Sequence, residues 1–235
     1  MDNISSFYQS FVEQKITTAQ TIAAGSCEGT YAEGALIMCA VISAMSAIAW
    51  PGKGQDRKRF VEIITRFSPL GINPKKVSGP LLVQDGKICN SIIGIPSKSF
   101  KLTEANDHYE EDIINLCPRL ALPEIRKYSY ANLLYEQIRC NYAHQYRIGP
   151  SASEHDSLRQ KQIMDINESD ISYVSVIGDN VSFLQVIYFP LKWIASVVQS
   201  VAKGLDVELS RQGKMPFDDL CLDIPNPWWL DGKNS

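Results

Sequence analysis

The sequence predicts a mostly α-helical protein, a helical bundle with small β additions. Three observations support this fold class. Apolar residues recur at intervals of three and four along several stretches, as on the buried face of a helix. Proline and glycine interrupt this pattern between residues 68 and 102. Apolar and polar residues alternate over residues 171–189, which is typical of two strands joined by a turn.

The first part of the chain contains three predicted helices. Residues 2–23 carry an apolar stripe at helical spacing. Residues 31–50 are apolar on almost every side, which predicts a central, buried helix. Their apolar run is shorter than the roughly 20 residues that a membrane span needs, and it contains Ser43 and Ser46. Asp56 is the expected N-cap of the third helix, which follows it directly.

Residues 68–122 are predicted to be an irregular insertion between core helices. The Asp-Gly pair at 85–86 is flanked by β-forming residues and predicts a β-hairpin over residues 81–89. A short acidic helix is expected over residues 103–116, with Thr103 as its N-cap.

The second half of the chain is expected to return to helix. A long helix is predicted from Pro123 to Tyr146, and Gly149-Pro150 ends it. A polar linker over residues 151–162 and the two predicted strands come next. Pro190 suits the first turn of a closing helix.

These elements predict one domain over residues 1–222 and a C-terminal tail over residues 223–235. The tail contains two prolines and no periodic pattern. Its Trp228 and Trp229 are expected to pack on the body of the protein, because a pair of exposed tryptophans would be a liability.

The composition argues against several function classes. The formal net charge is −3, so the chain as a whole has no strong attraction to nucleic acid or to an anionic membrane. None of the six cysteines lies in a C-x-x-C pair and no histidine is spaced for a zinc site, so neither a metal nor another cofactor is expected. Cys39 and Cys140 fall in apolar helical patterns, where a free thiol acts as a small hydrophobe, and the start of the sequence lacks signal-peptide features. Both observations predict a cytoplasmic protein without membrane association. The even number of cysteines leaves disulfides open, although a chain of this size does not need them.

Two of the three histidines are weak candidates for a site. His108 precedes Glu111 and Asp112 by three and four residues, which on a helix would suit a metal ion. An acidic first turn favoured by the helix dipole is the simpler interpretation. His155 lies in the polar linker, where a surface position is expected.

The stretch with the strongest chemical pattern is LLYEQIRCNYAHQY, residues 133–146. On an ideal helix, Arg139 lies at the edge of the apolar stripe, and His144 lies about 140° away from it. Both side chains reach one site if the helix loosens near its end, or if two copies of the chain meet around a two-fold axis.

These residue types together can cleave RNA without a metal. His144 would remove the proton from a ribose 2′-hydroxyl, which attacks the adjacent phosphorus, and Arg139 would stabilise the developing negative charge. Asn141 would orient the phosphate or the imidazole, and Glu136 would hold the guanidinium. The spacing also occurs by chance, and the helix dipole favours a histidine near a helix C-terminus, so an ordinary polar helix end stays open.

The same stretch resembles the signature of the HEPN superfamily, in which an arginine is followed a few residues later by a histidine on a late helix of an α-bundle. Here the motif reads Arg139-x4-His144. The family usually has a polar residue directly after the arginine, whereas this chain has Cys140 there and Asn141 next. The helices of the first part and the closing helix also look HEPN-like, so the resemblance covers most of the chain apart from the insertion and the tail.

The resemblance implies an up-and-down helical bundle that acts as a homodimer, with Arg139 and His144 of both copies in one cleft. The implied activity is a metal-independent endoribonuclease whose products carry a 2′,3′-cyclic phosphate and a 5′-hydroxyl. The implied setting is toxin–antitoxin or anti-phage defence, with a cognate antitoxin or another regulatory protein as partner. In some members a nucleotide is transferred to a tyrosine that Tyr146 matches here, although Tyr146 also fits as an ordinary aromatic residue at a helix end. Other HEPN-like proteins are interaction modules, so a catalytically silent binding module is the alternative.

Overall fold

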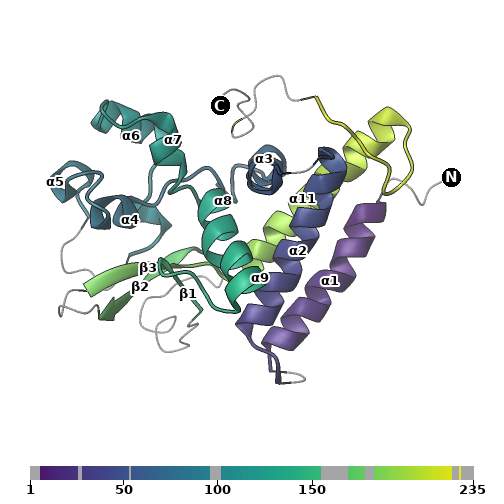
Figure 1. Cartoon of the computed structure of the whole chain (residues 1–235), viewed down its shortest axis with the longest axis horizontal. Helices are drawn as coiled ribbons and strands as arrows, with labels where there is room; N and C mark the ends of the chain where they lie inside the picture. Colours follow the sequence, from purple (N-terminus) through teal and green to yellow (C-terminus); the bar gives the residue numbers. More distant parts are fainter. Residues whose placement is uncertain are drawn as a thin grey trace. The chain divides into compact units, whose positions relative to one another are not determined.

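The computed structural model describes residues 6–25, 28–52, 54–95, 102–154, 169–177, 183–223 and 228. Within these ranges the protein is mostly helical and contains a small three-stranded sheet (Figure 1), as the sequence predicts. The chain forms two compact units, which we call unit 1 (residues 1–73 and 194–235) and unit 2 (residues 74–193).

Unit 1 is built from helices whose apolar faces pack together. Helix α2 packs against both α1 and α3, and its buried residues include Met38, Ile42 and Met45. Asp56 is the first residue of α3 rather than its N-cap, and its carboxylate pairs with Arg59. The helices are α1 (Phe7–Ala23), α2 (Tyr31–Ala49), α3 (Asp56–Phe67) and α11 (Leu191–Gln212), of which the last begins in unit 2.

Helix α2 is long and apolar enough to cross a membrane by length and composition alone. Half of that segment is buried within the protein. A capping box fixes its start, because the Thr30 hydroxyl accepts from the Ala32 N–H at 3.2 Å while the Glu33 carboxylate accepts from the Thr30 N–H at 2.8 Å.

The start of α1 is capped by a distant carboxylate. Ser6, at the N-cap position, makes no side-chain capping bond. Instead the backbone N–H groups of Tyr8 and Gln9 donate to the buried carboxylate of Asp206, on α11, at 2.8 and 3.0 Å. An anion at the first turn also interacts favourably with the helix dipole, so Asp206 joins α11 to α1.

The end of the chain packs on unit 1. The N–H groups of Leu220 and Leu222 donate to carbonyls in the last turn of α2, those of Ile48 and Ala49. Trp228 is buried, which confirms the expected packing of this side chain. Trp229 lies outside the described residues.

Unit 2 contains the sheet, in the order β1-β3-β2. Strands β2 and β3 pair antiparallel, with Ser172 opposite Tyr188 and Ile177 opposite Phe183, which confirms the two predicted strands. The turn that joins them lies outside the described residues. The strands are β1 (Ala152–Ser153), which falls in the predicted linker and pairs parallel with β3, β2 (Ser172–Ile177) and β3 (Phe183–Tyr188).

The predicted hairpin over residues 81–89 is wrong. The first of these residues belong to a short helix instead. Ser78 caps this helix by accepting from the Leu81 N–H at 3.2 Å, and Pro80 suits its first turn. The Asp-Gly pair ends this helix, and Gly86 takes a φ of 65°. The helical structure of the predicted insertion continues past residue 122, so from here on we take the insertion to run to residue 126. It contains α4 (Gly79–Gln84), α5 (Asn90–Ile93), the 3-10 helix η2 (Glu104–Asn106), α6 (Glu110–Leu116) and α7 (Leu122–Arg126).

The single acidic helix expected over residues 103–116 is also wrong. Thr103 caps only η2, and the chain is extended at His108, whose backbone N–H and C=O pair with those of Val77 at 3.1 and 2.8 Å. His108 therefore lies outside α6, and the helical spacing to Glu111 and Asp112 does not hold. The insertion has its own apolar cluster, formed by Val77, Leu82, Ile88, Ile113 and Ile125.

Candidate functional site

The candidate motif lies on a helix that begins later than the sequence predicts. The predicted helix over 123–146 is interrupted at residues 127–129, and a second helix starts from Ser129. The Ser129 hydroxyl accepts from the Asn132 N–H at 3.3 Å and donates to the Arg126 carbonyl at 2.8 Å. The second helix consists of α8 (Tyr130–Leu133), η3 (Leu134–Cys140) and α9 (Asn141–Gln145).

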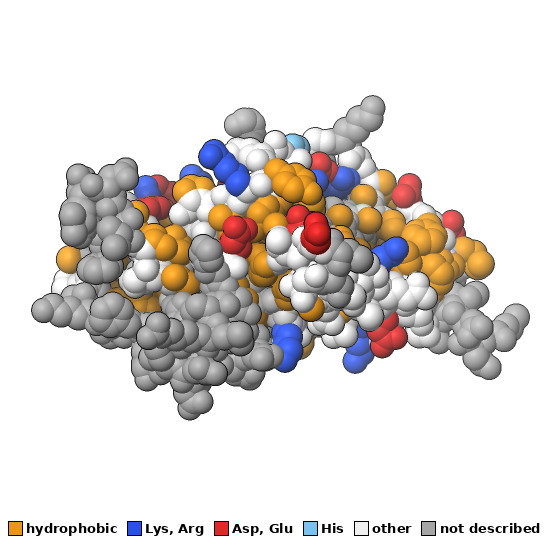
Figure 2. Space-filling view, turned by 90° about the horizontal axis from the view of Figure 1, so that it is seen from below, with side chains coloured by type: hydrophobic (Ala, Val, Ile, Leu, Met, Phe, Trp, Pro, Cys, Tyr) orange, Lys and Arg blue, Asp and Glu red, His pale blue; other side chains and the backbone are white. Residues whose placement is uncertain are grey.

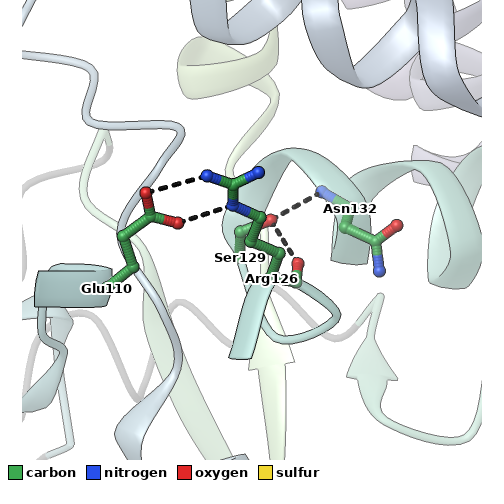
Figure 3. Close-up of polar contacts among 4 residues, drawn as sticks. All are labelled: Glu110, Arg126, Ser129 and Asn132. Atoms are coloured by element: carbon green, nitrogen blue, oxygen red, sulfur yellow. Dashed lines mark hydrogen bonds and ion pairs between the residues drawn. The ribbon is translucent and has the colours of Figure 1, made fainter. Parts of the chain in front are cut away.

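An ion pair supports the start of this helix. Arg126, at the end of α7, donates from Nε and Nη2 to the two carboxylate oxygens of Glu110, on α6, at 2.7 and 3.2 Å. Figure 3 shows this pair beside the cap formed by Ser129 and Asn132. Both side chains are mostly buried, so this two-bond contact is better shielded from solvent than a surface ion pair.

A buried carboxyl group holds the first turn of α8. Tyr130 and Tyr173 both donate their hydroxyls to Asp107, and the Gly79 N–H donates to it at 2.9 Å. Burial raises the pKa of Asp107 to about 6, although the three donors and the charge of Lys76 act in the opposite direction. The pKa values of both tyrosines are raised well above normal, mainly by burial and by the neighbouring carboxylate. Sequence reasoning missed this cluster because its members come from four separate segments.

The middle of the helix is a π turn. Segment η3 is wider than an α-helix because its hydrogen bonds run from residue i to i+5. Tyr130, Leu134, Ile138 and Tyr142 recur every four residues and all are buried. Residues four apart move past a full turn in an α-helix and fall short of one in the wider π turn, so the two rotations partly cancel along this segment and all four side chains stay on the core side. Such turns are frequent at functional sites.

The structure places Arg139 in the last part of the π turn, where it is partly buried. Its guanidinium carbon lies 5.4 Å from the centroid of the Tyr135 ring. This cation–π geometry holds the side chain along the helix surface.

His144 is exposed in the final turn of α9. Four of the five residue-to-residue rotations between Arg139 and His144 are those of an α-helix, at about 100° each. The two side chains therefore point to different sides of the helix. One copy of the chain thus presents them in different directions.

The two predicted supporting residues are engaged within the helix itself. Glu136 accepts from the side-chain amide of the fully buried Asn132 at 3.3 Å. Asn141 donates its side-chain amide to the backbone carbonyl of Glu136. Asn141 therefore satisfies a main-chain group of the π turn.

Tyr146 follows the helix as its C-cap, with a φ of 54° and 74% of its surface exposed. This exposed position is compatible with both interpretations of Tyr146 from the sequence. It could accept a transferred nucleotide, and it also fits as an ordinary aromatic residue at a helix end.

The described part of the chain has two further features that bear on ligands. No group of three or more His, Cys, Asp or Glu side chains in it could hold a metal ion. A groove of about 340 Å³ lies between α1 and α11 of unit 1. Its lining is mostly polar, with Val12 the one apolar member: Gln9, Val12, Glu13, Ser196, Gln199, Ser200 and Lys203.

Charged side chains of both signs are interspersed on the face drawn in Figure 2. Among the described residues of that face, neither the Lys and Arg side chains nor the Asp and Glu side chains form a continuous field, which agrees with the small net charge of the chain. Any attraction to a polyanion on this face would therefore be local.

Comparison of the chain with protein-family models, curated proteins and solved structures finds no match.

Proposed function

We propose that the protein is a metal-independent endoribonuclease of the HEPN type, in which Arg139 and His144 from two copies form the active site. The observation that carries this proposal is the placement of the Arg139-x4-His144 motif on one helical segment, with Arg139 in a π turn and His144 exposed at the end. A π turn is uncommon and often marks a functional position.

The proposed reaction needs only these two groups and the RNA. His144 takes the proton of the ribose 2′-hydroxyl, and the 2′-oxygen bonds to the adjacent phosphorus as the bond to the 5′-oxygen breaks. The leaving 5′-oxygen takes up a proton, so the products are a 2′,3′-cyclic phosphate and a 5′-hydroxyl. Arg139 holds the extra negative charge on the phosphate oxygens, for which its planar, permanently charged guanidinium is suited.

The different directions of the two side chains support a site formed by two copies. Around a two-fold axis each residue occurs twice, so Arg139 of one copy lies opposite groups of the other copy. His144 is exposed and accessible for such a contact. The proposal therefore includes a homodimer, RNA as substrate and a role in toxin–antitoxin or anti-phage defence.

The alternative is a catalytically silent HEPN-like module that binds a protein partner. The formal net charge of −3 favours it, because an enzyme acting on RNA usually offers the backbone a basic surface.

The ribonuclease is tested with RNA in the presence of a chelator. We expect His144→Ala and Arg139→Lys each to lower the cleavage rate by about 100-fold or more, since a general base and a charge-stabilising group each contribute that much. Gln145→Ala is the matched control, because Gln145 is the exposed neighbour of His144 on the same turn. An RNA with a single 2′-deoxy sugar at the cleavage position should not be cut there.

Mixing two inactive variants tests the shared site. A mixed dimer of Arg139→Lys and His144→Ala chains can bring the Arg139 of one copy to the His144 of the other, so activity should return in part. Cleavage that survives both substitutions would exclude this mechanism. If the wild-type protein leaves several RNAs intact, the binding module becomes the better interpretation.

A further inference from the structure

The main chain that follows the motif returns to the π turn and closes over it. The Gly149 N–H donates to the backbone carbonyl of Gln137 at 2.8 Å. The Ser151 N–H donates to the side-chain oxygen of Gln137 at 3.1 Å. We call residues 149–151 the clasp. Gln137 lies within η3, two residues before Arg139, so both bonds hold the π turn itself.

Gly149 is required here for space and not for backbone conformation. It is buried, and its φ lies outside the left-handed region. A Cβ at this position would overlap the side-chain oxygen of Gln137 and would lie 2.8 Å from the side-chain nitrogen of Asn141. Asn141 is the residue whose amide satisfies the Glu136 carbonyl in the same turn. The clasp therefore packs directly on the two side chains that complete the π turn.

The clasp is also continuous with the sheet of unit 2. The Ser151 carbonyl accepts from the Ile187 N–H, on β3, at 2.9 Å. The next residue, Ala152, begins β1 and pairs with Ile187 in parallel register. Strand β3 thus fixes one side of the clasp, and Gln137 fixes the other.

We propose that the clasp is a positioning device for Arg139, and that Gln137 and Gly149 are positioning residues of the ribonuclease site. This inference rests on the proposed function. A π turn that relaxes to an α-helix narrows and rotates the residues on its two sides relative to each other. Arg139 would then leave the direction from which it meets the phosphate. Because Arg139 acts in the transition state, the loss should fall on kcat and leave KM nearly unchanged.

The first test compares Gly149→Ala with Gly71→Ala. Gly71 is a matched control because it has no atom within 4 Å of an added Cβ and its φ is also outside the left-handed region. We expect Gly149→Ala to lower kcat about tenfold or more, since a small misplacement of a catalytic group has effects of this size. We also expect the amides of residues 137–142 to exchange hydrogen about tenfold faster, because the clasp no longer protects the turn.

The second test uses the side chain of Gln137. Gln137→Glu keeps an acceptor for the Ser151 N–H and should retain kcat within about threefold, whereas Gln137→Leu removes the acceptor and should behave like Gly149→Ala. If Gly149→Ala fails to fold, this pair decides the question alone.

The outcomes separate the clasp from the proposed function. If the wild-type protein does not cleave RNA, the proposed function fails and the positioning role fails with it. This holds even if hydrogen exchange shows that the clasp protects the π turn. If exchange accelerates while kcat stays at the level of Gly71→Ala, the positioning role is overturned. If neither quantity changes in Gly149→Ala and Gln137→Leu, the clasp itself is overturned.

Discussion

At the scale of single residues, the buried carboxyl group of Asp107 is held by two tyrosine hydroxyls and one backbone N–H. A buried carboxylate without an ion pair in direct contact is costly unless hydrogen bonds satisfy it. These donors come from the starts of α4 and α8 and from strand β2, so Asp107 joins the start of the motif helix to two other elements of unit 2. Its carboxyl group should be visible in the pH dependence of stability.

We expect Asp107→Asn to remove part of that pH dependence. Burial raises the pKa of Asp107 to about 6 in the folded protein, above its value in the unfolded chain, so between about pH 4 and 6 the folded state holds a proton that the unfolded state has lost. The contribution of Asp107 to the free energy of unfolding therefore rises as the pH falls from 7 to 4, by about 2–3 kcal/mol.

Urea unfolding at several pH values measures this effect as the difference between wild type and variant. Asp219→Asn is the control, because Asp219 is exposed. Parallel pH profiles for wild type and Asp107→Asn would contradict the assignment.

At the scale of elements, the periodic apolar pattern predicted the helices of unit 1 because one face of each is buried. The same reasoning failed at residues 81–89, because an Asp-Gly pair can end a helix as readily as it can turn a hairpin. It also failed at Ser129, where hydrogen bonds to Arg126 and Asn132 begin a new helix inside a continuous pattern. The sequence feature that accompanies the π turn is the spacing of four residues between buried side chains from Tyr130 to Tyr142. This spacing differs little from the 3.6 residues per turn of an α-helix, so it could not be recognised from the sequence.

A second prediction concerns the packing of α11 in unit 1. A Cβ at Gly204 would overlap the ring of Phe67, the last residue of α3. We expect Gly204→Ala to destabilise the protein by about 1–3 kcal/mol, because overpacking outweighs the better helix propensity of alanine. Lys203→Ala, at an exposed position on the same helix, should change stability little in chemical denaturation. A more stable Gly204→Ala protein would show that the ring moves aside freely.

At the scale of the whole molecule, the chain folds into two units, each with its own buried residues. The sequence indicated the positions of Arg139 and His144 on a late helix. It left open how the two meet, because the spacing along one helix directs them to different sides, and the second copy that would bring them together is part of the proposed function. The Asp107 cluster was hidden from sequence reasoning because its members lie far apart along the chain. The clasp was hidden because its contact is a return of the main chain to Gln137 across 14 residues, which leaves no periodic pattern.

The two units make a third prediction. Asp107→Ala removes the acceptor of two buried donors of unit 2, the Tyr130 hydroxyl and the Gly79 N–H, whereas the Tyr173 hydroxyl keeps Ser78 at 2.7 Å. Amides of the described residues of unit 2 should therefore exchange hydrogen about tenfold faster or more. Gly204→Ala should have its effect on the described parts of unit 1. Hydrogen exchange followed residue by residue on the full-length protein distinguishes the two patterns. A uniform acceleration across the chain in both variants would mean that the units open together.

The cap on α1 has a consequence for how the chain is made. A ribosome releases Tyr8 and Gln9 long before Asp206, which follows them by 198 and 197 residues. At a synthesis rate of about 5–20 residues per second, the first helix waits on the order of ten to forty seconds for the carboxylate that completes it. Helix α1 is therefore completed by a carboxylate that is translated 198 residues after Tyr8.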